Sequence, residues 1–138
     1  MGRDGGGNGA GTPTRVLLID DDELVARSIA LLLEDDYDVV IECAGNQALE
    51  RMKSESFELV LCDLSMPGLS GSQLYQRLAA ANPKQASRMI FMTGGAYQAD
   101  GQRFLDNSIQ PWLAKPFTQS ELQAAIARVY QEIDERSR

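Results

Sequence analysis

The sequence predicts an α/β domain in which one parallel, five-stranded β-sheet is covered by helices on both faces. Between Arg15 and Ile133, short continuous apolar runs alternate five times with segments that carry apolar residues at helical spacing. Such alternation is typical of strands joined by crossover helices, which place the strands parallel. The chain of 138 residues has room for only one such domain. Its 43% hydrophobic and 24% charged residues are the composition of an ordinary globular protein.

The N-terminal segment has a different composition. It reads MGRDGGGNGAGTPT, and six of its first eleven residues are glycine. Such a segment buries too little apolar surface to offset the entropy lost on ordering. We therefore expect a flexible tail or linker at 1–14, the folded domain at 15–134, and a short C-terminal tail at 135–138.

The first half of the domain contains three predicted strands. An apolar run at 16–19 is followed by an amphipathic helix in which Val25, Ile29 and Leu33 share one face. A second strand is expected at 37–43 and a helix at about 45–55. The third strand, at 57–63, contains the run LVLCD and leads into the turn signal MPG.

The second half continues the alternation. Ser70 is in position to cap a helix that Asn82 and Pro83 end, and RMIFMT at 88–93 reads as the fourth strand. A weak helix is expected at 98–105 and a short strand at 112–114. Because Pro111 lacks an N–H group, this last strand is expected at an edge of the sheet. In the final helix, Thr118 and Glu121 match a capping box, and an apolar stripe runs from 122 to 133.

Polar residues follow four of the predicted strands. They are Asp20 and Asp21 after the first strand, Asp63 at the end of the third, Thr93 at the end of the fourth, and Lys115 after the fifth. In open α/β sheets the ligand crevice lies outside the carboxyl ends of the strands, so these five side chains are expected to meet there.

Three clustered carboxylates impose a chemical requirement. Two like charges about 4 Å apart repel by roughly 4 kcal/mol at an effective dielectric near 20, so the cluster needs a proton, a cation or Lys115 beside it. Oxygen ligands without His or Cys favour a hard cation, and Mg²⁺ fits such a set. Asp22 and Glu23 are expected instead to occupy the first turn of the following helix.

Several classes of function are disfavoured by composition. The chain has no histidine, and Cys43 and Cys62 lack metal-ligand spacing, so neither a zinc site nor a histidine-dependent triad is expected. Both cysteines are expected to be buried thiols in a reducing compartment. A net charge of -7 disfavours nucleic acid and anionic membranes as partners. No run of about 18 apolar residues and no signal peptide are apparent, so a cytoplasmic domain is expected.

Four short motifs together resemble a known family. IDDDE follows the first strand, LCDLSMPG the third, MTGG the fourth and AKPF the fifth, in the order and spacing found in the receiver domain of bacterial two-component response regulators, the CheY-like family. The resemblance covers Arg15 to about Ile133. It implies a flavodoxin-like, doubly wound sheet with strand order 2-1-3-4-5 and five helices.

The resemblance also implies a reaction. Asp63 would accept a phosphoryl group from a phosphohistidine on a histidine kinase or a histidine phosphotransfer domain. Asp21, Asp63 and the backbone carbonyl of Ser65 would be Mg²⁺ ligands, with Asp20 acting through water. Such a domain catalyses its own phosphorylation and dephosphorylation.

Two further residues are assigned by the resemblance. Lys115 and Thr93 would contact the phosphoryl oxygens. Movement of Thr93 toward the phosphoryl group would free space for an aromatic residue three positions before the lysine, here Trp112, to turn inward.

The chain departs from the family pattern in three places. Trp112 stands where Tyr or Phe is usual, the stretch NSIQPW replaces a GADDY-like sequence, and Gly101 interrupts the helix before it. These departures weaken the case for a charged dimer face, so a monomer or weak dimer is expected. The glycine-rich start and the lack of an output domain favour the receiver of a hybrid histidine kinase over a free-standing regulator.

Two other classes of protein fit part of the pattern. A haloacid-dehalogenase-like phosphatase has an Asp-x-Asp motif that Asp20 and Asp22 satisfy, and it would place the nucleophile at Asp20. It also expects Thr or Val two residues after the second Asp, where this chain has Leu24. The other class is a pseudo-receiver, a non-phosphorylated interaction module that has usually lost an acid or the lysine, all of which are present here.

Overall fold

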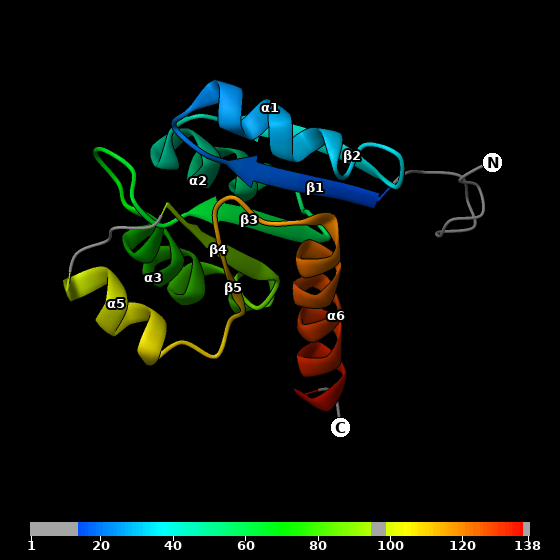
Figure 1. The fold of residues 1–138 in the computed structure, drawn as a ribbon. Coiled ribbons are helices and arrows are strands. Elements are labelled where there is room, and N and C mark those ends of the chain that lie inside the picture. The colour runs from blue at the N-terminus through cyan, green and yellow to red at the C-terminus, as the bar shows by residue number, and fades with distance from the viewer. Residues whose placement is uncertain (1–13, 95–98, 137–138) are drawn as a thin grey trace.

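Five parallel strands form one sheet in the order β2-β1-β3-β4-β5 (Figure 1). The computed structural model describes residues 14–94 and 99–136. The strands are β1 (Thr14–Ile19), β2 (Tyr37–Glu42), β3 (Leu59–Asp63), β4 (Met89–Thr93) and β5 (Trp112–Ala114). The helices are α1 (Glu23–Leu31), α2 (Gly45–Ser54), α3 (Gly71–Ala81), α4 (Pro83–Ala86), α5 (Ala99–Asp106) and α6 (Gln119–Arg136). The predicted fold class and strand order are therefore confirmed.

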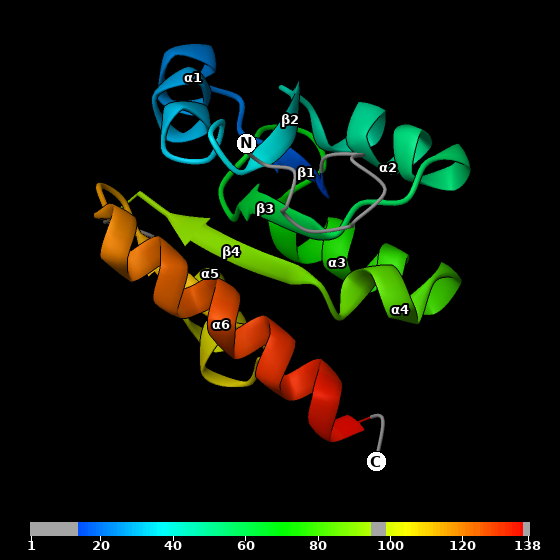
Figure 2. The ribbon, with the colours of Figure 1, turned by 90° about the vertical axis from the view of Figure 1, so that its right-hand side faces the viewer.

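The helices cover the sheet on both faces (Figure 2). Each face has its own hydrophobic core. On one face α1 and α6 pack through Ile29, Leu122 and Ile126 against Leu18 of β1. The other face is covered by α2, α3 and α5. The central strands β3 and β4 are buried along their whole length. They read as continuous apolar runs because both of their faces are covered.

The described residues contain six helices instead of the expected five. Asn82 ends α3, as predicted, but it also caps α4, a single turn that begins at Pro83. The Asn82 side chain accepts a hydrogen bond from the backbone N–H of Gln85. Proline is well suited to the first position of a helix, so the same Asn-Pro pair that stops one helix starts the next.

Side chains cap the starts of α1, α3 and α6. The Asp22 carboxylate accepts hydrogen bonds from the N–H groups of Leu24 and Val25, which makes it the N-cap of α1. Ser70 forms a full capping box at α3. Thr118 and Glu121 exchange hydrogen bonds of 2.8 and 3.1 Å at the start of α6. Each cap satisfies backbone donors that a helix leaves free at its first turn.

Two buried glutamines, Gln85 and Gln110, hold the backbone around the start of β4. The Gln85 side chain accepts from Phe57 N–H at 2.9 Å and donates to Phe57 C=O at 2.8 Å. Gln110 donates from Nε2 to the carbonyl groups of Ser87 and Met89. Side-chain amides therefore complete the hydrogen bonding of the backbone around α4.

Several element boundaries differ slightly from expectation. Thr14 is already part of β1, and α6 continues through Glu135 to Arg136. Residues 1–13 and 137–138 of the expected tails, together with Gln98 at the start of the expected weak helix, lie outside the described residues. One prediction is wrong: Cys43 is exposed, because β2 ends at Glu42, whereas Cys62 is buried. None of the helices described is long and apolar enough to cross a membrane.

Candidate functional site

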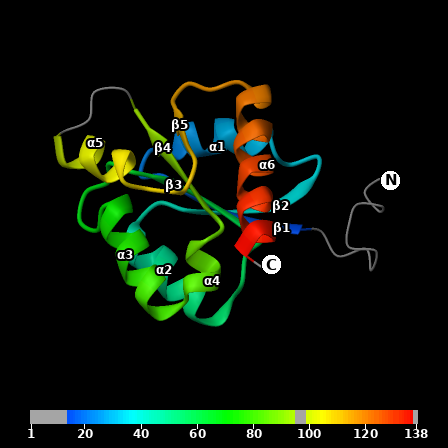
Figure 3. The same ribbon diagram turned by 90° about the horizontal axis from the view of Figure 1, so that it is seen from below.

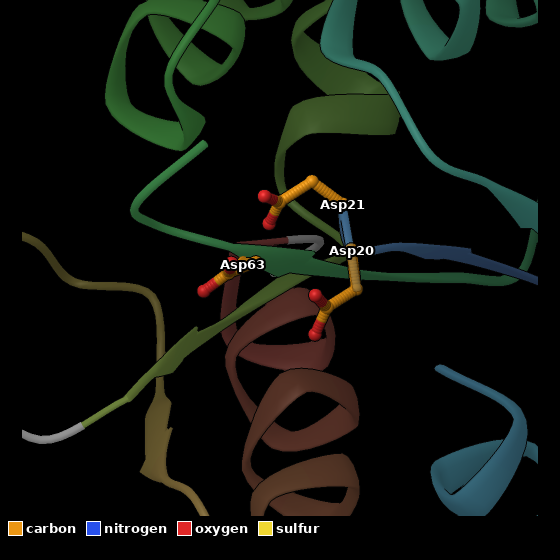
Figure 4. A group of neighbouring side chains, drawn as sticks. All are labelled: Asp20, Asp21 and Asp63. Atoms are coloured by element: carbon orange, nitrogen blue, oxygen red, sulfur yellow. The ribbon is translucent and has the colours of Figure 1, made fainter. Parts of the chain in front are cut away.

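The acidic site is formed where β1 and β3 end side by side. The two strands are parallel and pair Ile19 with Cys62, so Asp20 and Asp63 are neighbours across the sheet. Asp20, Asp21 and Asp63 each place one carboxylate oxygen within 4.8 Å of the others (Figure 4). Asp20 and Asp63 are buried and Asp21 is exposed. The structure thus brings together the three acids predicted from the sequence.

Lys115 approaches these acids from the end of β5. Its Nζ lies 2.8 Å from Oδ2 of Asp20 and 3.6 Å from Oδ1 of Asp63. Asp20 accepts a second hydrogen bond, at its Oδ1, from the backbone N–H of Asp22. Both oxygens of Asp20 therefore have a partner, whereas the Lys115 ammonium lies farther from Asp63.

The pKa of Asp63 reflects this difference. Burial, together with the charges of Asp20 and Asp21, raises the pKa of Asp63 to about 6, although the charge of Lys115 and the hydrogen bond from the Ser65 N–H act to lower it. The pKa of Lys115 is raised: burial acts to lower it, but the hydrogen bonds and charges of Asp20 and Asp63 outweigh that effect. Lys115 is thus a fixed cation, and Asp63 holds a proton more readily than an ordinary carboxyl group.

Thr93 ends β4 beside this cluster. It pairs in register with Ala114, the residue before Lys115. Its side chain is 1% exposed, and among the described residues its Oγ1 is a buried polar atom without a hydrogen-bond partner. A buried hydroxyl without a partner costs free energy unless a ligand or water completes it. Thr93 is therefore a donor available at the edge of the site.

The backbone after Asp63 is tightly packed. Gly68 adopts a φ of 76°, which suits glycine in the turn after Pro67. At Gly71, the first residue of α3, an added Cβ would lie 2.5 Å from the carbonyl oxygen of Asp63 and 2.8 Å from Cα of Leu64. Gly71 N–H donates to the Leu64 carbonyl at 3.0 Å. Only glycine lets α3 start this close to the strand that carries Asp63.

Trp112 lies outside the acidic cluster. It begins β5, is 41% exposed, and pairs in register with Phe91 of β4. Because side chains alternate between the faces of a strand, Trp112 and Ala114 share a face, and so do Phe91 and Thr93. Trp112 therefore lies on the same face of the sheet as Thr93, one pair of residues farther from the site.

The donor set fits a hard divalent cation. Three carboxylates at the ends of two adjacent strands supply only oxygen, and the exposed Ser65 lies two residues after Asp63. Mg²⁺ prefers such oxygen ligands together with water, and the exposed Asp21 leaves one side open to solvent.

A family model identifies the protein family of this domain. The model for the response regulator receiver domain matches residues 16–127, which is most of the folded part of the chain. The chain belongs to the receiver domain family. It is therefore a receiver domain of two-component signalling, as the four sequence motifs predicted.

Curated relatives and solved structures agree with this assignment. The receiver domain is 32% identical over 114 residues to response regulator ArlR of Staphylococcus saprophyticus, covering 82% of this chain and 50% of that protein. It is 31% identical over 117 residues to cell cycle response regulator CtrA of Brucella ovis, covering 84% and 48%. The chain spans about half the length of these relatives.

Two solved structures show the same receiver fold. A response regulator receiver domain protein from Clostridium thermocellum has a TM-score of 0.75 and 25% identity, with 88% of this chain and 97% of that one covered. The receiver domain of sensor histidine kinase PA1611 from Pseudomonas aeruginosa PAO1 has a TM-score of 0.73 and 27% identity, with 85% and 97% covered. In the latter structure a magnesium ion is coordinated in the active site cleft.

Sequence reasoning missed one residue that shapes the site. Gly71 gave no signal, because a glycine directly after a capping serine reads as part of an ordinary helix start. Its role depends on the distance between α3 and β3, which no local pattern encodes.

Proposed function

We propose that Asp63 is the phosphoacceptor of this receiver domain and takes a phosphoryl group from a phosphohistidine. The observation that carries the proposal is the position of Asp63 beside a fixed cation, two further carboxylates and the Thr93 hydroxyl, which has no partner in the described ranges 14–94 and 99–136. In the transfer, the N–P bond of the phosphohistidine breaks, an Asp63 carboxylate oxygen forms the new O–P bond, and the imidazole nitrogen keeps the electron pair. Positioning and charge neutralisation are the main requirements of such a reaction.

Each neighbour of Asp63 has a role in this proposal. Asp20, Asp21, Asp63 and the Ser65 carbonyl would hold Mg²⁺, with Asp20 acting through water, and the bound ion would neutralise charge on the phosphoryl oxygens. The Lys115 ammonium, 3.6 Å from Asp63, would pair with a phosphoryl oxygen. Thr93 would donate its free hydroxyl to another oxygen of the group.

Asp63 is a better nucleophile candidate than Asp20. Both oxygens of Asp20 are engaged, by Lys115 and by the Asp22 N–H, and its side chain is 1% exposed. Asp63 lies at the end of the central strand, with the longer contact to Lys115 and a backbone hydrogen bond from Ser65. The phosphatase alternative, which needs Asp20 as the nucleophile, therefore has less support. The pseudo-receiver alternative lacks support because every acid and the lysine are in place.

The partner and the setting follow from the same proposal. The phosphodonor would be a histidine kinase or a histidine phosphotransfer domain, met in the cytoplasm. Trp112 would act as the aromatic switch residue that responds when Thr93 moves. The receiver of a hybrid histidine kinase is the larger protein we favour, with the solved receiver of a sensor histidine kinase as a structural precedent.

Phosphorylation is tested by mass spectrometry after treatment with a small phosphodonor and Mg²⁺. The wild-type chain should gain one phosphoryl group, Asp63→Asn should gain none, and Asp22→Asn, which changes an acid of the α1 cap, should still gain one. Peptide mapping should locate the group on the peptide that contains Asp63. A phosphoryl group on Asp20, or full labelling of Asp63→Asn, would reject the assignment.

A further inference from the structure

A second polar cavity lies at the opposite end of the sheet from Asp63. It has a volume of about 540 Å³ and lies between α4 and the last turns of α6. Figure 3 shows α4 near the C-terminal end of α6. Its lining residues are Pro83, Lys84, Ser87, Arg88, Ile133 and Arg136. Arg88 directly precedes β4 and Thr93 ends it, so the two sites are separated by roughly 17 Å of strand at 3.3 Å per residue.

A different cavity, of about 610 Å³, lies between α1 and the loop after β5 and borders Lys115. That cavity adjoins the phosphoacceptor site, whereas the cavity between α4 and α6 does not share a lining residue with it. We call the cavity between α4 and α6 the basic cavity, because three of its six lining residues are Lys84, Arg88 and Arg136.

The basic cavity is unusual in a chain with a net charge of -7. Within the described residues, Lys84 and Arg136 form no ion pair, although most of the other cations do. Arg88 is paired with Glu58, but only through Nη1. Because a guanidinium has five N–H donors, most of those on Arg88 are still available to a ligand. Lys84 and Arg136 therefore give the cavity positive charge that no ion pair with a described residue neutralises, and Arg88 adds donors that Glu58 does not occupy.

The backbone that carries these cations is held rigidly. The hydrogen bonds of Gln85 to Phe57 and of Gln110 to Ser87 and Met89 fix α4 and the residues after it. The Tyr130 hydroxyl donates to the same Glu58 oxygen that pairs with Arg88, which ties α6 to this end of the sheet. A preformed cavity binds a ligand with a smaller loss of conformational entropy.

We propose that the basic cavity binds a compact organic phosphate of about nucleotide size. Lys84, Arg88 and Arg136 would contact the phosphate oxygens, and Pro83 and Ile133 would contact the apolar part of the molecule. The volume of about 540 Å³ falls in the range of small-molecule sites, roughly 300–1,000 Å³. An extended polyanion such as nucleic acid fits less well, because the exposed Glu135 lies next to Arg136 and the whole chain is acidic.

The proposal is tested by calorimetric titration of the full chain with ADP, with Mg²⁺ left out so that the acidic site does not hold phosphate. We expect ADP to bind with a Kd of about 1 mM or tighter, and pyrophosphate to bind more weakly because it lacks the apolar part. The double variant Lys84→Gln/Arg136→Gln should weaken ADP binding at least fivefold. Both residues are exposed and form no ion pair with described residues, so the variant should fold normally.

Two controls separate this site from general surface charge. Arg77→Gln removes an exposed cation of α3 that does not line the cavity, and it should leave the Kd for ADP within about twofold. Lys115→Ala should likewise leave it unchanged. No measurable ADP binding, equal weakening by Arg77→Gln, or tighter binding of an acidic peptide or an oligonucleotide than of ADP would each overturn the proposal.

Discussion

The two ends of the sheet differ in how completely their buried polar groups are hydrogen-bonded. At the start of β4, Gln85 and Gln110 are buried and each makes two hydrogen bonds to backbone groups. At the end of β4, Thr93 is buried and its hydroxyl has no hydrogen-bond partner among the described residues, and Asp63 has a raised pKa. The first end contributes to stability, whereas the second keeps binding capacity free for a ligand at a cost in stability. Four predictions test this contrast.

The largest effect is expected at the start of β4, where the buried polar groups are hydrogen-bonded. Gln85→Ala should lower the free energy of unfolding by about 2–4 kcal/mol, because it leaves the buried N–H and C=O of Phe57 without partners. Chemical denaturation measures this change. Gln123→Ala, at an exposed position of α6, is the matched control and should change the stability by less than about 0.5 kcal/mol. Equal effects of the two variants would mean that the Gln85 bonds are not important for stability.

At the other end, removing charge should stabilise the metal-free protein. Asp63→Asn should raise the free energy of unfolding by an amount on the order of 2 kcal/mol at about pH 8. The native state binds the Asp63 proton with a pKa of about 6, above the ordinary value of 3.8, so ionisation destabilises the wild-type fold as the pH rises through this range. The gain should therefore shrink as the pH falls below about 6.

Asp20→Asn is the control for this charge effect. Asp20 has Lys115 at 2.8 Å and the Asp22 N–H at 2.9 Å, so its removal should destabilise the metal-free protein instead of stabilising it. Denaturation at two pH values measures both variants. If Asp20→Asn and Asp63→Asn change the free energy of unfolding in the same direction, the two buried acids are equivalent, which would contradict the geometry.

A smaller effect is expected at Thr93. Thr93→Val keeps the shape of the side chain and removes a buried hydroxyl for which the described part of the chain offers no partner, so the stability should stay the same or rise by up to about 1 kcal/mol. Thermal unfolding measures it. Thr14→Val, at a partly buried position of β1 far from the site, controls for the gain that a β-branched apolar residue brings to a strand. A loss of more than about 1 kcal/mol would mean that the Thr93 hydroxyl is already bonded.

The smallest effect is a change in fluorescence. Trp112 is the single tryptophan and is 41% exposed, so a switch that buries it should shift its emission when a phosphoryl mimic binds with Mg²⁺. Thr93→Val should reduce the shift, and Mg²⁺ alone should cause less of it. Unchanged emission after binding is shown by calorimetry would reject Trp112 as the switch residue.

The sequence predicted the acidic cluster better than the supporting contacts. Asp20, Asp21 and Asp63 follow apolar strands, and parallel strands bring their carboxyl ends to one edge, so pattern alone brought the acids together. The roles of Gln85 and Gln110 could not be predicted, because a glutamine in a polar segment normally faces solvent. Their burial depends on where Phe57 and Met89 lie in the folded chain.

The sequence also could not rank the three acids. Repulsion among them was expected, but which one pairs with Lys115 depends on the path of the loop after β5. The short helix α4 was missed for a similar reason: Asn82 and Pro83 mark the end of one helix and the start of another with the same two residues. Cys43 was expected to be buried because an apolar run precedes it, yet β2 is an edge strand and ends one residue earlier.

The contact at Gly71 has a mechanical consequence. With no room for even one extra carbon between α3 and the Asp63 carbonyl, the backbone at Asp63 and the first turn of α3 cannot move independently. The eleven residues of α3 form a rod about 16 Å long, and Asn82 joins its far end directly to α4. A small displacement of the Asp63 backbone would therefore be transmitted along this rod to the opposite end of the domain.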